Sequence, residues 1–228
     1  MSQLTQMSQL TVAIVVGHGN RGDRDDPGVT HDLDGDGVVE VSTESEARVL
    51  RDLLVGVIRY GLASEGATVH VIDAGPYTER HATARKIAEA SSLCAILHAH
   101  IDAGSASSSR PLIGYWKASA EGRELAEQVA TGWGMHAPAW MRPEQPWMRA
   151  YVGDEEEQWA RNGAALLYET WRTPRWCTGV LLEPFHLAVL AGKPWYDRAV
   201  ALIQVAQGVV VGVDRWAAWA VTNKIART

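Results

Sequence analysis

The chain has 228 residues, of which 46% are hydrophobic and 21% charged, with 21 Gly and 9 Pro. This composition is ordinary for a globular protein and excludes the disordered, collagen-like and low-complexity classes. The net charge of −6 at pH 7 argues against nucleic acid or an anionic membrane surface as the main partner. The aromatic residues are unevenly distributed, because ten Trp stand against one Phe and every Trp lies at or beyond Trp116.

The N-terminus repeats Met-Ser-Gln-Leu-Thr and has neither a basic segment nor an apolar stretch, so residues 1–10 are predicted to be a loose tail and not a secretory signal. Residues 11–228 contain no repeat or linker and are predicted to form one domain. No apolar run reaches the ~18 residues that a membrane helix needs. Cys94 and Cys177 lie in apolar, strand-like segments, which predicts buried free thiols.

Strand and helix patterns alternate along the chain. Short apolar runs predict strands at 11–16, 67–73, 94–101, 111–117 and 176–183. Apolar residues at helical spacing predict helices at 43–62, 79–92, 121–133 and 196–219, the first of them opened by a capping box of Thr43 and Glu46. Residues 136–157 have no period and predict a long loop or a small lid. The alternation predicts an α/β fold: a single domain with a mostly parallel, twisted sheet of five to six strands and helices on both faces.

The first predicted strand ends in Gly17-His18-Gly19-Asn20-Arg21-Gly22, which formally matches the dinucleotide-binding pattern G-x-G-x-x-G. That pattern also needs a helix beginning inside it, whereas Pro27 and Gly28 follow a run of carboxylates that would repel phosphate. The sequence therefore argues against nicotinamide binding. His18 nevertheless lies at the carboxyl end of a strand, where open α/β sheets bind their ligands.

Two further strand ends carry similar side chains. His98 and His100 share one face of the third strand because they are two residues apart, and Glu183 ends the fifth strand. Two imidazoles and one carboxylate with an open position form the usual catalytic zinc set. The alternative is that these are separately hydrogen-bonded polar residues at the rim of the sheet.

The order and spacing of several motifs resemble the zinc-dependent N-acetylmuramoyl-L-alanine amidases of the Amidase_3 type. These motifs are VVGHGN followed by DDPG, a Glu at the start of the next helix, HAHIDAG and GVLLEPF, within about residues 12–215. The resemblance implies that His18 and His100 are zinc ligands and that Glu183 is the catalytic carboxylate. His98 stands where the family has Ser, and it becomes the ligand instead if the register is shifted.

The resemblance also implies a Glu ligand at the start of the first helix. Counting back from the strand entry at Gly66 indicates Glu46, whose alternative role is only to cap its helix. Glu40 resembles the local context of the family's Glu but lies further upstream, and Glu44 is the third candidate.

An acidic segment precedes that helix. Asp32, Asp34 and Asp36 form the D-x-D-x-D-G start of a calcium loop, which Glu40 would join at the ninth position, although Thr43 replaces the usual Glu at the twelfth. The segment is either a structural Ca²⁺ site or a solvated acidic loop.

The resemblance implies a hydrolase with one Zn²⁺ per chain that cleaves the amide between N-acetylmuramic acid and L-alanine in peptidoglycan. Two alternatives stay open: a zinc amidohydrolase or peptidase for small N-acyl amino acids or peptides, and a non-catalytic module whose Trp side chains stack on wall glycans. Trp140 and Trp147, in the irregular segment, are predicted to face the substrate. A chain made in the cytoplasm without a signal peptide suits a phage endolysin that acts on the cell wall after release.

Overall fold

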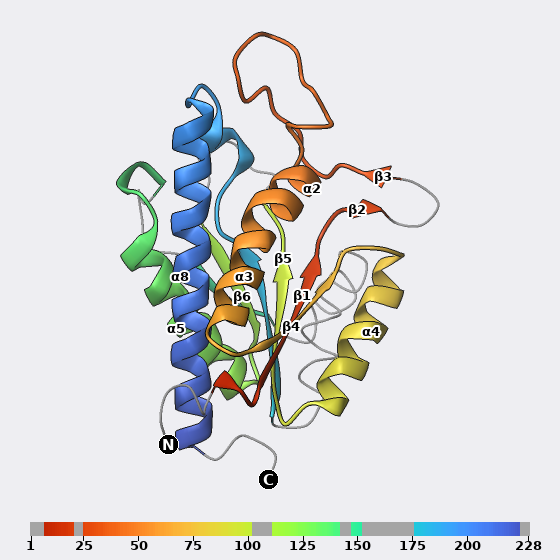
Figure 1. The fold of residues 1–228 in the computed structure, drawn as a ribbon, viewed down its shortest axis with the longest axis vertical. Coiled ribbons are helices and arrows are strands. Elements are labelled where there is room, and N and C mark those ends of the chain that lie inside the picture. Colours follow the sequence, from red (N-terminus) through yellow and green to blue (C-terminus); the bar gives the residue numbers. More distant parts are fainter. Residues whose placement is uncertain (1–6, 21–24, 102–110, 142–146, 152–175, 224–228) are drawn as a thin grey trace.

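The computed structural model describes residues 7–20, 25–101, 111–141, 147–151 and 176–223. Its centre is a six-stranded sheet in the order β4-β1-β5-β8-β6-β7 (Figure 1). The strands are β1 (Leu10–Val16), β4 (Thr68–Ile72), β5 (Leu93–Ala99), β6 (Leu112–Trp116), β7 (Trp147–Tyr151) and β8 (Cys177–Glu183). β4, β1, β5 and β8 are mutually parallel, whereas β6 runs antiparallel to β8 and parallel to β7. The predicted single-domain α/β fold with a mostly parallel sheet is therefore confirmed.

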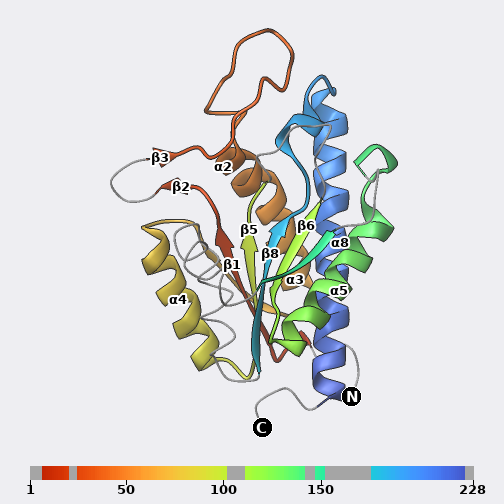
Figure 2. The ribbon, with the colours of Figure 1, turned by 180° about the vertical axis from the view of Figure 1, so that it is seen from behind.

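Helices cover both faces of this sheet, as Figures 1 and 2 show. α4 (Tyr77–Ala90) covers one face, where a smaller core includes Ala84, Ile96 and both cysteines. The other face carries α2 (Glu46–Val49), a π-helical segment (Leu50–Val55), α3 (Gly56–Ser64), α5 (Ala120–His136) and α8 (Trp195–Thr222). The main core lies beneath these helices. Cys94 and Cys177 are buried, unbridged register partners on β5 and β8, as predicted.

α5 and α8 approach each other closely because both carry glycines at their contact. A Cβ on Gly132 would lie 2.1 Å from the Gly208 carbonyl oxygen, so no larger residue fits there. Within the described residues, α8 alone is long and apolar enough to cross a membrane. Half of its most apolar window is buried in the domain, which a core helix of a soluble fold also shows.

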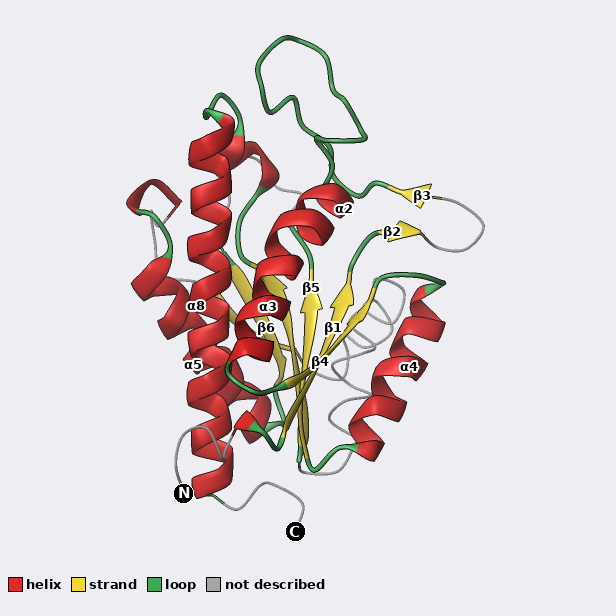
Figure 3. Ribbon diagram, in the orientation of Figure 1, coloured by secondary structure: helices red, strands yellow, loops and turns green. Residues whose placement is uncertain are grey.

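Three local predictions are wrong. The first helix begins at Glu46, its N-cap Ser45 makes no side-chain cap, and Thr43 bonds the Glu40 carbonyl instead, so there is no capping box. The predicted loose tail 1–10 is wrong for residues 7–10, because Met7 is buried and Leu10 begins β1; residues 1–6 lie outside the described part of the chain. Within the stretch 136–157, predicted as a long loop or small lid, the structure describes a 3₁₀ turn (Ala139–Met141), drawn as helix in Figure 3, and the edge strand β7, while 142–146 and 152–157 lie outside the described residues. β7 is defined by its pairing with β6, which local periodicity does not report.

Candidate metal centre

His18, Glu46 and His100 come together at the carboxyl ends of β1 and β5. Val16 and Ala99 are register partners in these parallel strands, so the two histidines follow at the same edge of the sheet. Glu46 reaches this edge as the first residue of α2. One potential ligand atom from each of the three side chains lies within 4.8 Å of the other two.

The Glu46 carboxylate is the centre of the group. Its Oε2 lies 3.3 Å from His18 Nε2, and its Oε1 lies 3.2 Å from His100 Nδ1. The side chain is only 1% exposed, and its oxygens also accept hydrogen bonds from the backbone N–H groups of Val29 and Ile101. These bonds fix both oxygens without a helix cap, which explains why Glu46 does not reach back toward Thr43.

Two glycines make room for this arrangement. A Cβ on Gly17 would lie 2.4 Å from the His100 ring, and a Cβ on Gly28 would lie 2.5 Å from Glu46 Oε2 and 2.8 Å from the His18 ring. Gly28 also has a φ of +68°, which favours glycine. Gly17, directly before His18, and Gly28, at the end of the Asp-Pro-Gly turn, are therefore required by the site itself.

The donor set fits a divalent metal ion such as zinc. Two imidazole nitrogens and a carboxylate oxygen are borderline ligands that suit zinc, and a buried carboxylate is costly unless it is paired or coordinating. The histidine side chains are 22% and 14% exposed, so one side of the group faces solvent. Three protein ligands with an open side are characteristic of a catalytic metal site, whereas structural zinc sites are closed.

Asp26 supports His18 from the other side of its ring. β2 (Gly19–Asn20) and β3 (Asp25–Asp26) pair with Gly19 opposite Asp26, and this places Asp26 Oδ2 3.1 Å from His18 Nδ1. A carboxylate on the second ring nitrogen orients a ligating histidine and raises its basicity. Asp26 was not among the predicted site residues, although it lies within the Asp-Asp-Pro-Gly motif.

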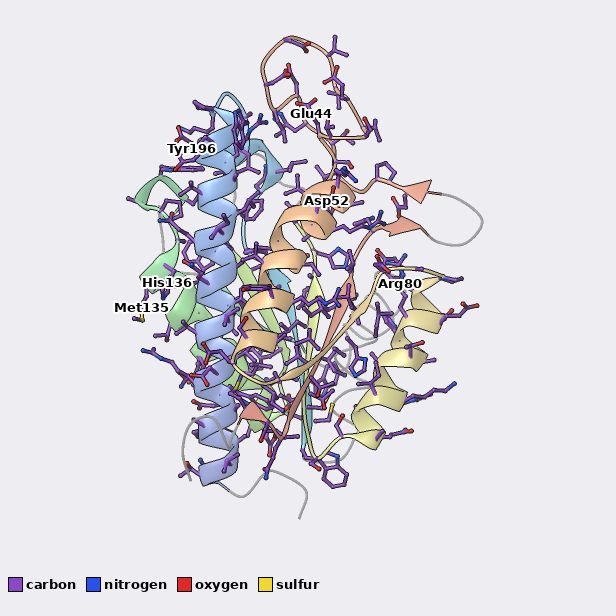
Figure 4. All side chains as sticks on the ribbon, viewed as in Figure 1. Glu44, Asp52, Arg80, Met135, His136 and Tyr196 are labelled. Atoms are coloured by element: carbon purple, nitrogen blue, oxygen red, sulfur yellow. The ribbon has the colours of Figure 1, made fainter. Side chains whose placement is uncertain are left out.

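Arg80 stabilises the loop that carries His18. Its side chain, 1% exposed, donates from Nη1 to the carbonyl oxygens of Val16 and His18 at 2.5 and 3.1 Å, and from Nε to the Gly75 carbonyl at 2.7 Å. Figure 4 shows Arg80 at the end of α4 that lies beside the carboxyl edge of the sheet. Arg80 lies four residues before Ala84, on the buried face of the helix. A charged residue on that face is the sequence signal that could have identified Arg80 as a buried donor.

Glu183, the predicted catalytic carboxylate, ends β8 beside His100. Leu182 is the register partner of Ala99, and His100 N–H donates to the Leu182 carbonyl oxygen at 2.8 Å. The half-buried Glu183 therefore lies at the same sheet edge as the metal group. Its catalytic role stays a prediction.

The structure does not bring Glu40 or Glu44 to His18 and His100; it groups both with Asp34. The buried Glu44 accepts hydrogen bonds from the backbone N–H groups of Leu33, Asp34 and Glu40. Burial would raise the pKa of Glu44, but these bonds outweigh it and hold the pKa below its usual value. Glu44 is thus ionised, and its three hydrogen bonds hold the two ends of the acidic loop together.

His98 lies within β5, two residues before His100, which follows the strand, and His98 is not part of the metal group. Neither ring nitrogen has a hydrogen-bond partner among the described residues, and the ring contacts those of His100 and His81 at centroid distances of 4.9 and 5.4 Å. Burial, together with the neighbouring His100 and His81, holds the pKa of His98 well below its usual value. We therefore describe it as a neutral imidazole beneath the site.

The three aspartates of the predicted calcium loop also lie together. Asp32 accepts bonds from Gly35 and Gly37 N–H, and Asp34 accepts one from Asp36 N–H. These bonds shape the loop by themselves, so Ca²⁺ binding stays a prediction.

The two predicted substrate-facing tryptophans differ in what is described of them. Trp140, in the 3₁₀ turn, is 38% exposed, and Lys193 Nζ lies 5.2 Å from the centre of its ring. Trp147 begins β7, and its side chain lies outside the described residues.

Comparison with known proteins finds no matching family model and no matching curated sequence. Solved structures do match. The CwlD amidase from Clostridioides difficile, solved with the GerS lipoprotein, has a TM-score of 0.61 at 15% identity over 92% of this chain and 98% of that chain. The amidase Ami1 from Mycobacterium smegmatis has a TM-score of 0.57 at 16% identity over 92% and 97%.

The catalytic domain of the endolysin CD27L, which targets Clostridia difficile, has a TM-score of 0.56 at 17% identity over 89% of this chain and 96% of that chain. Nearly whole chains superpose in each case. The protein therefore has the fold of the N-acetylmuramoyl-L-alanine amidases.

Proposed function

We propose that the protein is a zinc-dependent N-acetylmuramoyl-L-alanine amidase that hydrolyses the amide between N-acetylmuramic acid and L-alanine in peptidoglycan. The observation that carries this proposal is the partly open group of His18, Glu46 and His100 at the carboxyl edge of the sheet. The amidase fold of the chain supports the choice of substrate class.

In this proposal His18, Glu46 and His100 hold the metal. When bound, Zn²⁺ would polarise the amide carbonyl and lower the pKa of water. Glu183 accepts the proton of the attacking water and delivers it to the amide nitrogen as the C–N bond breaks. Asp26 and Arg80 keep His18 in place through its ring and its backbone. The products are a lactyl carboxylate on the sugar and a peptide with a free L-alanine amine.

The test combines metal analysis with product analysis. Glu183→Gln should bind zinc with wild-type stoichiometry but release no peptide from purified cell walls, because it cannot accept the water proton. Glu89→Gln, at an exposed position near the far end of α4, is the matched control and should be fully active. Mass spectrometry of the products should show intact glycan strands and peptides beginning with L-alanine. Wild-type activity in Glu183→Gln would contradict the assignment of that residue.

The same experiment separates the alternative functions. Hydrolysis of small N-acyl amino acids without release from cell walls would favour a general amidohydrolase. Wall binding that survives chelation, without hydrolysis, would favour a glycan-binding module. We further propose an endolysin role, supported by the fold shared with the CD27L catalytic domain. It predicts that the added protein lyses bacteria from outside or after membrane permeabilisation.

A further inference from the structure

A cavity that is separate from the metal group lies between the acidic loop and the start of α8. Its volume is about 290 Å³, close to the lower limit of small-molecule sites, which suits a single amino-acid residue. Its walls are largely aliphatic and are formed by Leu33, Val49, Leu190 and Leu202. A hydrogen bond of 3.0 Å from Gly192 N–H to the Leu33 carbonyl joins the two sides.

Arg198 is the cation of this cavity. Its side chain is half-buried and lines the cavity, and its guanidinium makes no hydrogen bond or ion pair with any residue of the described part of the chain. The neighbouring Glu44 carboxylate is already occupied by three backbone N–H groups. Glu44 and Asp34 line the same cavity, but neither makes a direct ion pair with Arg198, so its planar donors stay available for a carboxylate in two-point contact.

Aromatic side chains stand at the mouth. Trp195 lines the cavity yet is 71% exposed, and the neighbouring Tyr196 is 63% exposed, with its ring centroid 6.0 Å from that of Trp195. Figure 4 shows Tyr196 and Glu44 at the same end of the molecule, above the sheet. Large aromatic surfaces left exposed beside a cavity are typical of ligand contact.

The cavity adjoins the metal group through the chain itself. Glu44 lines the cavity and Glu46 belongs to the metal group, so their Cα atoms are at most about 7 Å apart. The Glu44 wall of the cavity and the metal group are therefore neighbours along the chain.

We propose that this cavity binds a free carboxylate of the peptide part of the substrate, with Arg198 as its counter-ion and Trp195 packed against the aliphatic part of the same residue. This inference rests on the proposed amidase function. Asp34 also lines the cavity, and its carboxylate selects a ligand that brings an amide or ammonium donor together with the carboxylate. A peptide end has both groups, whereas an inorganic anion has none to offer Asp34.

The experiment measures binding of a product peptide, L-alanyl-γ-D-glutamyl-L-lysine, to the zinc-loaded protein by titration calorimetry. The peptide is compared with its carboxamide form, in which each free carboxylate is an amide. Arg198→Met should weaken binding of the acid form by about 10- to 100-fold and should leave the weak binding of the carboxamide unchanged. Arg215→Met, on an exposed face of the same helix, should have no effect.

Trp195→Ala should weaken binding of the acid peptide, whereas Tyr60→Ala, at the similarly exposed Tyr60 on α3, should not. Equal affinity of the two peptide forms for the wild type, or wild-type affinity in Arg198→Met, would overturn the proposal. Loss of N-acetylglucosamine-oligomer binding in Trp195→Ala, without loss of peptide binding, would also overturn it and indicate a sugar site. The binding assay does not depend on catalysis, because the probe peptide is not hydrolysed. If the protein binds the peptide through Arg198 but cleaves no muramoyl amide, the proposed amidase function is refuted and the carboxylate site is not.

Discussion

Gly17 tests the metal centre most directly, because it is not a ligand and yet it sets the position of one. In Gly17→Ala the new Cβ would lie 2.4 Å from Cε1 and Nδ1 of His100, whereas ordinary contact begins near 3.4 Å. The ring must therefore move by about 1 Å, several times the ~0.2 Å that zinc coordination tolerates. We expect the zinc affinity to fall by at least about 100-fold, or about 2.7 kcal/mol.

The assay is a zinc titration of the metal-free protein against a competing chromophoric chelator, with thermal unfolding of the same samples. Gly134→Ala is the matched control, because a Cβ there meets nothing within 4 Å inside α5. It should keep the zinc affinity and gain about 0.5–1 kcal/mol of stability. In a His100→Ala background, Gly17→Ala should have almost no effect on stability, since the clashing ring is gone. A folded Gly17→Ala protein with wild-type zinc affinity would refute the placement of His100.

Four further substitutions test the supports around the site. Asp26→Asn should weaken zinc binding by about 10- to 100-fold in the same titration, because His18 loses its carboxylate neighbour; unchanged affinity would show that Asp26 is not needed. Arg80→Met should lower the free energy of unfolding by about 3 kcal/mol, because buried carbonyl groups lose their donor, whereas the exposed Arg85→Met should not. Folding lowers the pKa of Glu44, so the stability that its carboxylate contributes is present above pH 4.5 and is lost as the pH falls through the pKa of the folded state. Amide exchange at Leu33 should therefore accelerate in the wild type as the pH falls below 4.5. In Glu44→Gln the same exchange should be fast at all pH values. Trp140→Ala should slow wall digestion without changing zinc content or melting temperature, and full wall activity would remove Trp140 from the substrate surface.

The sheet could be predicted because buried parallel strands have a strong local signal. β1 and β5 are unbroken apolar runs, and their neighbouring positions bring His18 and His100 to one edge. The edge strand β7 has no such signal, because its pairing with β6 is a tertiary interaction. The direction of β6 was equally hidden, since an antiparallel strand inserted beside β8 has the same periodicity as a parallel one.

The candidate site could be predicted only where a side chain lies next to a strand or helix end. The family spacing counted back from Gly66 indicated Glu46 before Glu40 and Glu44, but the contacts that hold its carboxylate in place come from Val29 and Ile101, which are 17 and 55 residues away. Arg80 acts over 62 residues on the His18 carbonyl. A local sequence pattern does not indicate such long-range hydrogen bonds, because the packing of α4 against the sheet determines which groups meet.

The uneven distribution of tryptophan has a structural reason once the two ends of α8 are compared. Trp216 is fully buried toward its carboxyl end, and Trp133 packs on α5 in the same core, so these serve the fold. Trp195 begins the same helix and is exposed beside the Arg198 cavity, and Trp140 lies against Lys193, which comes just before the helix. All three proposed metal ligands precede residue 101, whereas the exposed tryptophans follow residue 139. Substitutions of the proposed metal ligands should therefore change metal affinity, and substitutions of Trp140 or Trp195 should change substrate affinity with the metal still bound.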